Sequence, residues 1–72
     1  FNPRTTIEFS IKENEIGILS IYNTKGQLIE SKEFPTGEHS YHWNADKVTS
    51  GIYFYKLQTQ SFNQIKKMIL MK

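Results

Sequence analysis

The sequence predicts an all-β protein, a small antiparallel β-sandwich of six to seven strands with immunoglobulin-like architecture. Short β-prone segments recur along the chain with turn residues between them, about every 8–12 positions. Hydrophobic and polar residues alternate within these segments, as in strands that bury one face. No segment keeps a helical period with caps at both ends. Because the 72-residue chain contains no cysteine, packing of aliphatic and aromatic side chains must stabilise it.

Six segments carry this pattern. In the first of them, Ile7, Phe9 and Ile11 share one face. Asn23 and Gly26 mark the clearest hairpin turn, because both residue types accept a left-handed backbone at little steric cost. Strands are expected at residues 5–11, 16–22, 27–34, 38–43, 52–59 and 64–71.

Two of these strands have a predicted position in a sheet. Segment 27–34 contains Glu30, Lys32 and Glu33, and we expect an edge strand because charges discourage pairing with other chains. Segment 52–59 is apolar on both faces at its start, which is typical of a central strand.

Charge and termini limit the classes of function. The 9 Lys and Arg residues exceed the 7 Asp and Glu residues by only two, and the charges are interspersed, so we expect no nucleic-acid partner. No apolar segment approaches the roughly 20 residues that a membrane-spanning helix needs. Phe1-Asn2-Pro3 are typical of a linker, so residues 1–4 are expected to end a linker and residues 5–72 to form one domain.

The sequence gives no sign of a catalytic, cofactor or metal site. The two histidines, His39 and His42, lie three residues apart on a strand and so project to opposite faces, which prevents joint binding of one metal ion. A catalytic triad would need Ser40 or Ser50 with His42 and Asp46. Neither serine lies in a nucleophile-elbow motif. We therefore expect a protein that is not an enzyme and holds no cofactor.

The aromatic residues Tyr41, Trp43, Tyr53 and Tyr55 allow two interpretations. Their alternation along strands favours packing in the core of a thin sandwich. If two or three of these rings were coplanar and exposed, they would instead form a platform for sugars, as in a carbohydrate-binding module.

The last segment also allows two interpretations. Within 64–71, Ile65, Lys67 and Ile69 oppose Lys66, Met68 and Leu70 in alternation. The segment is either a strand that closes a sheet with lysines outside, or a recognition element. A partner could read such an element by adding a strand to the sheet edge, with the lysines providing charge complementarity.

Five motifs, in order along the whole chain, resemble the type A C-terminal sorting domain of the type IX secretion system. These are Phe1-Asn2-Pro3 with residues 5–9, Ile21-Tyr22-Asn23 with Gly26-Gln27, Gly37 and His39 with Trp43-Asn44-Ala45, residues 50–57, and residues 66–72. Asn44 stands where this family more often has Asp. The same motifs also resemble the immunoglobulin-like domain of flagellar hook-capping proteins.

The resemblance implies a non-catalytic sorting signal at the C-terminus of a larger cargo protein of a Gram-negative bacterium. A Sec signal takes such a cargo to the periplasm, where type IX translocon and shuttle proteins recognise the domain and export the cargo across the outer membrane. A sortase-like cysteine protease commonly removes the domain at the surface. The expected location is therefore secreted or cell-surface, with peripheral outer-membrane association through partners.

The resemblance also implies two sets of functional residues. By match to the closing motif, recognition by the translocon is expected at Lys66, Lys67, Met68, Ile69, Leu70 and Lys72. Maintenance of the fold is expected from Asn23, Gly26, Gly37, Trp43, Gly51 and Tyr53. A structural or adhesive immunoglobulin-like module retained on a secreted protein, or a carbohydrate-binding module, stays open as the alternative.

Overall fold

The computed structural model describes residues 4–71, and these form six β-strands without any helix. The strands are β1 (Arg4–Ile11), β2 (Gly17–Asn23), β3 (Leu28–Phe34), β4 (Gly37–Asn44), β5 (Gly51–Gln58) and β6 (Asn63–Leu70). Every boundary falls within one residue of the predicted segment. Residues 1–3 of the expected linker and Lys72 of the expected recognition set lie outside the described residues. No helix among residues 4–71 is long and apolar enough to cross a membrane.

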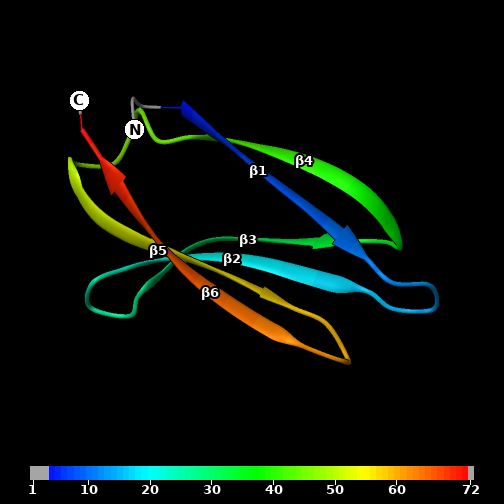
Figure 1. Ribbon diagram of the computed structural model, residues 1–72. Helices are drawn as coiled ribbons and strands as arrows, with labels where there is room; N and C mark the ends of the chain where they lie inside the picture. The colour runs from blue at the N-terminus through cyan, green and yellow to red at the C-terminus, as the bar shows by residue number, and fades with distance from the viewer. Residues whose placement is uncertain (1–3, 72) are drawn as a thin grey trace.

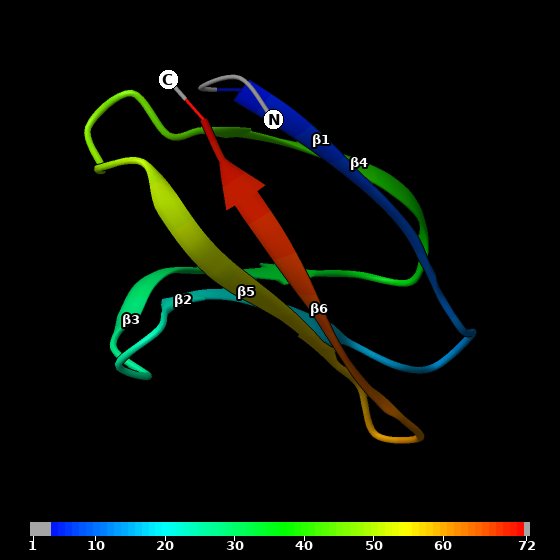
Figure 2. The ribbon, with the colours of Figure 1, turned by 60° about the vertical axis from the view of Figure 1, so that its left-hand side comes forward.

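The strands form two antiparallel sheets that pack face to face (Figure 1). One sheet contains β1 and β4, and the other has the strand order β3-β2-β5-β6. Figure 2 shows the pair β1 and β4 as a separate layer above the four-stranded sheet. The predicted small immunoglobulin-like sandwich is thus confirmed with six strands. The predicted edge position of segment 27–34 and central position of segment 52–59 are confirmed as well.

Both sheets have a regular register with a single irregularity. β1 and β4 pair over eight consecutive positions, from Arg4 opposite Asn44 to Ile11 opposite Gly37. β5 and β6 also pair over eight positions without a shift. The ladder between β2 and β3 is interrupted between Ile21 and Tyr22 by a bulge. A bulge increases the local twist, which makes an edge strand a poorer template for pairing.

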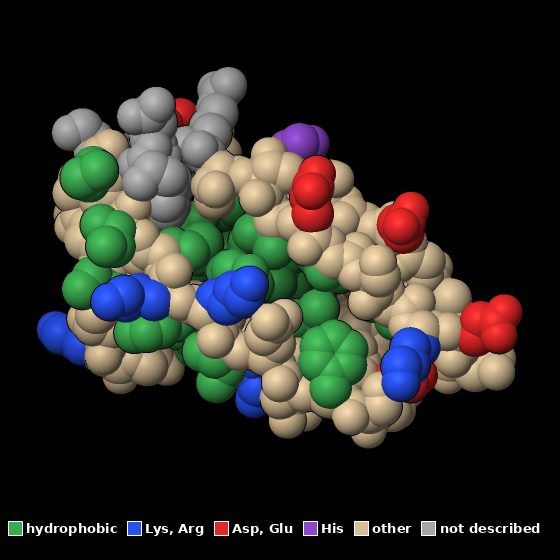
Figure 3. Space-filling model, viewed as in Figure 1, with side chains coloured by type: hydrophobic (Ala, Val, Ile, Leu, Met, Phe, Trp, Pro, Cys, Tyr) green, Lys and Arg blue, Asp and Glu red, His purple; other side chains and the backbone are tan. Residues whose placement is uncertain are grey.

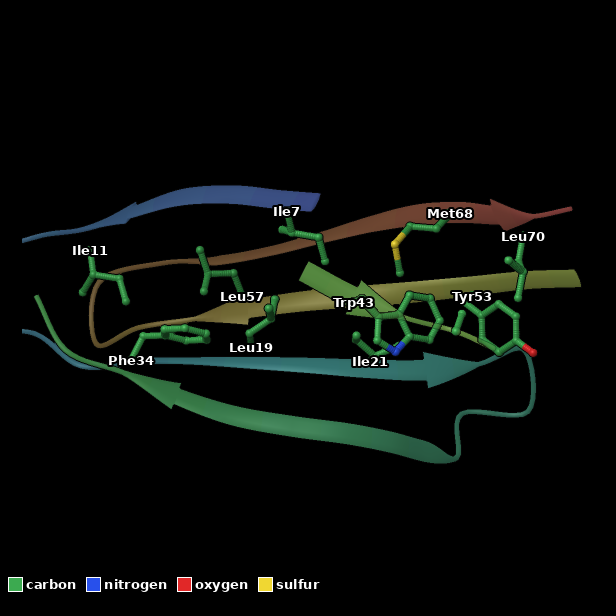
Figure 4. Packing of buried hydrophobic residues seen from close by; sticks show 11 residues of the cluster. Ile7, Ile11, Leu19, Ile21, Phe34, Trp43, Tyr53, Leu57, Met68 and Leu70 are labelled. Atoms are coloured by element: carbon green, nitrogen blue, oxygen red, sulfur yellow. The ribbon is translucent and has the colours of Figure 1, made fainter. Parts of the chain in front are cut away.

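The hydrophobic core lies between the two layers (Figure 4). β1 and β4 contribute Ile7, Ile11 and Trp43, which face side chains from the four-stranded sheet. That sheet contributes Leu19 and Ile21 from β2, Phe34 from β3, Tyr53 and Leu57 from β5, and Met68 and Leu70 from β6. Phe9, Tyr41 and Tyr55 pack against this cluster while partly exposed. The predicted common face of Ile7, Phe9 and Ile11 in the first strand is confirmed, and it points to the core.

One end of the sandwich is tied together by hydrogen bonds between turns. The Thr36 hydroxyl lies 3.0 Å from the carbonyl oxygens of both Lys12 and Glu15. The Glu15 carboxylate accepts hydrogen bonds from the backbone N–H and the hydroxyl of Ser61, at 3.2 and 2.9 Å. Hydrogen bonds from Thr59 and Ser61 hold the pKa of the Glu15 carboxyl below its ordinary value of 4.5. The turn between β5 and β6 is therefore anchored to the turn between β1 and β2.

Candidate functional site

The last strand, β6, occupies an edge of the four-stranded sheet and pairs only with β5. Its side chains alternate as the sequence predicts. Met68 and Leu70 point into the core and are 9% and 1% exposed. Ile65 and Ile69 point away from the core and are exposed. β6 is therefore held in the fold by its second half.

The first half of β6 is open on both faces. Residues 63–67 are all exposed, although Gln64 and Lys66 share their face with the buried Met68. The layer made by β1 and β4 thus leaves this part of the sheet uncovered. Ile65, on the outer face, is 64% exposed. A partner has access here to side chains on both faces of one strand.

The backbone of β6 also has a free edge. The hairpin between β5 and β6 is closed by a hydrogen bond of 2.9 Å from the Thr59 N–H to the Phe62 carbonyl. Because hydrogen-bonded pairs alternate along an antiparallel ladder, the register makes Gln64 and Lys66 bond to β5. The N–H and C=O groups of Asn63, Ile65 and Lys67 then face outwards, and no strand within residues 4–71 pairs with this edge.

Charge at this strand is entirely positive. Lys66 lies on the inner face opposite Tyr55, and Lys67 lies on the outer face opposite Phe54. Neither ammonium group forms an ion pair with a residue between 5 and 71. In Figure 3, hydrophobic and lysine side chains lie side by side over the region where Figure 1 shows β6, and most acidic side chains on view lie at the right-hand end. The strand therefore combines exposed aliphatic groups with uncompensated positive charge.

The turn between β2 and β3 is built by Asn23 and Gly26. The Asn23 side-chain oxygen accepts hydrogen bonds from the N–H groups of Lys25 and Gln27, at 2.9 and 3.0 Å. The Gly26 N–H donates to the Asn23 carbonyl at 3.0 Å, and its φ of 80° would strain a residue with a side chain. These two residues shape the hairpin, and their role in maintaining the fold stays a prediction.

The other residues expected to maintain the fold lie in the core or at the first position of a strand. Trp43 is 2% exposed and meets the Tyr53 ring edge-to-face, with ring centroids 5.5 Å apart. The buried Tyr53 hydroxyl donates a hydrogen bond of 2.6 Å to the Thr49 carbonyl, so burial of this ring leaves no polar atom unpaired. Gly37 and Gly51 begin β4 and β5 with φ values of 125° and 150°.

Comparison with known proteins decides the family. Residues 2–71 match the family of secretion system C-terminal sorting domains over almost the whole chain. The chain belongs to this family. Membership makes the protein a type IX secretion sorting domain, a signal that acts with the type IX machinery while it is fused to a cargo protein destined for the cell surface or for secretion. Neither a curated protein nor a solved structure matches the chain significantly.

The histidines of the sorting domain are placed as the sequence predicts, on opposite faces of β4. The inner His39 donates from Nε2 to the Pro35 carbonyl at 2.7 Å, and its ring packs against Phe9 and Phe34. The outer His42 is hydrogen-bonded through Nδ1 to the Thr6 hydroxyl at 2.9 Å. Among the described residues, no group of three or more His, Cys, Asp or Glu could hold a metal ion.

The residues that a catalytic triad would need lie on different elements. Ser40 is an exposed residue on the outer face of β4, whereas Asp46 and Ser50 lie in the connection between β4 and β5. The bond from Thr6 occupies the His42 nitrogen that faces β1. Sorting domains of this family are generally non-catalytic.

The aromatic side chains of the sorting domain do not form a sugar platform. Trp43 and Tyr53 are buried, and their rings are inclined by 70° rather than coplanar. Tyr41 and Tyr55 pack against the core from its margin. The core-packing interpretation is therefore correct for this cluster.

The outer face of the four-stranded sheet is an exposed surface that we did not predict from the sequence. Ile18, Leu28 and Ile52 are exposed there. The signal was present, since segment 52–59 is apolar on both faces. We interpreted it only as a sign of a central strand, and the structure covers one side of β5.

Proposed function

We propose that this domain is the export address of a larger secreted protein and that the secretion machinery reads it at β6. The observation that supports the proposal most directly is the family match across residues 2–71. In this proposal, residues 1–4 end a linker from the cargo, and residues 5–72 form the domain. Type IX translocon and shuttle proteins bind the domain, and a sortase-like cysteine protease removes it at the cell surface.

The expected recognition set divides into two roles. Lys66, Lys67 and Ile69 present their side chains outside the core and would contact a partner directly. Met68 and Leu70 are buried, so they would act by holding the strand in position. Lys72, beyond the described residues, would extend the positive charge.

The free backbone edge supports recognition by strand addition. Extended peptides bind sheet edges through main-chain hydrogen bonds, and side-chain contacts provide specificity. Asn63, Ile65 and Lys67 would supply the main-chain groups. An acidic partner strand would pair with Lys66 and Lys67, whereas a second β6 would bring like charges together at a cost in stability.

A secretion assay tests the address function. The chain is fused behind a Sec-targeted fluorescent protein in a type IX-competent host. We expect fluorescence in the medium or on the cell surface, and retention in the periplasm when the translocon is inactivated. A shorter exported fusion than the periplasmic form would support cleavage. Periplasmic retention of a folded fusion in the competent host would contradict the proposal and favour a structural or adhesive module.

Proline variants test strand addition separately. Ile65→Pro removes an outward N–H and leaves the ladder to β5 intact, which a proline at a sheet edge allows. We expect this variant to fold and to lose export, while Ile65→Val, which keeps the N–H and an aliphatic side chain, is exported. Export of Ile65→Pro at the normal level would show that recognition does not use the backbone edge. Lys66→Pro serves as the unfolding reference, because its N–H bonds to β5.

A further inference from the structure

The outer face of the four-stranded sheet carries an apolar surface that crosses all four strands. The register aligns Leu28, Tyr22, Phe54 and Lys67 in one row from β3 to β6. A second row contains Ser31, Ser20, Lys56 and Ile65, and Ile52 lies opposite Ile69 beside the first row. No element within residues 4–71 covers these rows, because β1 and β4 pack on the other side.

Large aliphatic side chains on this face are more exposed to solvent than the fold itself explains. Leu28 is 57% exposed and Ile18 is 42% exposed. The outer face of the two-stranded sheet shows that this protein can make a polar exterior. Its paired positions are all polar and exposed: Thr6 with His42, Glu8 with Ser40, and Ser10 with Glu38. Exposed apolar side chains gathered on only one of the two sheets are typical of an interaction site.

Most of the charge on this face is positive, and two lysines lie within the rows that cross the sheet. Lys67 follows Phe54 in the first row, and Lys56 lies between Ser20 and Ile65 in the second. A third row contains Glu33, Ile18, Gln58 and Asn63, and Glu33 is the single carboxylate in the three rows. A complementary partner surface must therefore place carboxylates among its own apolar side chains.

These features discriminate between possible occupants. A second copy stacked face to face would bring Lys56 and Lys67 of both copies into one interface with almost no carboxylate to pair them, which is unfavourable. A lipid bilayer keeps its anionic groups in a layer above its apolar region, whereas here cations and aliphatic groups share one flat surface. A protein surface can place carboxylates among aliphatic side chains, so it fits best.

We propose that the outer face of the four-stranded sheet, from β6 across to Leu28 on β3, is a docking surface for an aliphatic and acidic surface of a protein of the secretion machinery. The inference rests on the proposed function, since it extends the site at β6: Ile65, Lys67 and Ile69 project onto this same face. The partner would hold β6 at its edge and cover the sheet beside it.

Variants on the three other strands of the sheet test this surface. The double change Ile18→Ser with Leu28→Ser alters only exposed positions on β2 and β3, and Lys56→Glu reverses one central charge. In the fluorescent fusion we expect each to lower export about tenfold or more, because burying two aliphatic side chains contributes more than the about 1.4 kcal/mol that a factor of ten requires. Glu8→Lys, a charge reversal on the opposite outer face, is the matched control and should be exported normally.

Two further measurements separate the competing occupants. A photo-reactive amino acid at Phe54 should form a crosslink, in the host, to a protein of the type IX machinery, and Lys56→Glu should abolish it, whereas the same label at His42 should form none. In one experiment, the purified fusion is incubated with phosphatidylglycerol vesicles and its binding to them is measured. In another, the fusion is sedimented without vesicles to detect a dimer. Vesicle binding lost in Lys56→Glu, or a dimer lost in Leu28→Ser, would overturn the proposal in favour of a lipid or a second copy.

The outcomes also separate this inference from the proposed function. Normal export of folded Ile18→Ser/Leu28→Ser and Lys56→Glu fusions, with export lost in Ile65→Pro, would overturn the docking surface and leave the address function standing. Retention of every folded fusion in the periplasm, the unmodified one included, would overturn both the docking surface and the address function. Circular dichroism melting of each purified fusion shows whether a variant is folded.

Discussion

The two edges of the four-stranded sheet, β3 and β6, differ in how they are protected. β3 carries charges of both signs, Glu30, Lys32 and Glu33, and its ladder to β2 contains a bulge. β6 carries only lysines and has an uninterrupted ladder of eight pairs to β5. Charged side chains and bulges are devices that prevent edge pairing in soluble proteins. β3 has both devices, whereas β6 has its lysines but no bulge.

The difference teaches that openness at β6 is not a general property of this small sheet. Lys32 of β3 lies over the rings of Phe34 and Tyr41, at 5.5 and 5.7 Å from their centroids, so its charge is engaged across the two layers. Lys66 and Lys67 of β6 have no comparable contact among residues 5–71. The same sheet therefore has one edge built into the fold and one edge left available.

The largest effect on stability is expected in the core, where both edge strands bury a large hydrophobic side chain. Leu70→Ala in β6 should lower the free energy of unfolding by about 2–5 kcal/mol, and Phe34→Ala in β3 by about 3–5 kcal/mol, because each leaves a cavity. Urea denaturation of the purified domain measures both. A cost below about 1 kcal/mol for Leu70→Ala would show that the second half of β6 is not held as described.

A smaller effect is expected at the hairpin that holds β3. Asn23→Ala removes an acceptor for two backbone N–H groups and a donor to the Gln27 side chain. We expect a loss of about 1–2 kcal/mol, because each net hydrogen bond contributes roughly 0.5–1.5 kcal/mol. Amide exchange should quicken in β3 while β6 keeps its protection. Equal loosening of both strands would mean that the edges are not stabilised independently.

A matched pair of lysine substitutions tests the contrast directly. Lys32→Ala should cost about 0.5–1 kcal/mol, because it removes contacts of a cation with aromatic rings. Lys67→Ala should leave the melting temperature unchanged and reduce export only. If the two substitutions destabilise the domain equally, the proposed difference between an engaged and a free charge is wrong.

The smallest effect is expected at the anchor of the β5–β6 turn. Since the folded-state pKa of Glu15 is lowered, its contribution to stability is present above the unfolded-state pKa and is lost as the pH falls through the folded-state pKa. Glu15→Gln should therefore lower stability slightly at pH 7, where the carboxylate contributes, and flatten the loss of stability below about pH 4.5. Thermal melts of both proteins across the acid range measure this, and parallel curves would contradict it.

Local patterns in the sequence were sufficient to predict the strands. Alternation at a period of two gave all six within one residue at each end, and it placed Met68 and Leu70 on the face opposite Ile69. The charges of Glu30 and Glu33 correctly identified β3 as an edge. These features depend only on neighbours in the chain, and for that reason sequence reasoning reached them.

Pairing and coverage could not be predicted in the same way. Alternation separates two faces of β6 but does not say which face another layer covers. The match to the closing motif does not say so either, and it grouped the buried Met68 and Leu70 with the exposed Lys66 as one recognition set. The strand order β3-β2-β5-β6 and the uncovered outer face of β5 depend on contacts between distant segments. No spacing within the chain encodes them directly.

The long ladder between β1 and β4 has a mechanical consequence. Antiparallel hydrogen bonds run perpendicular to the strands. A pulling force applied along β1 from Arg4 would therefore load the bonds of all eight pairs together in shear, instead of opening them one after another. Such a force would have to break this ladder as a unit before β1 could leave β4, whereas a force that lifts β6 sideways from β5 would peel its pairs apart in sequence.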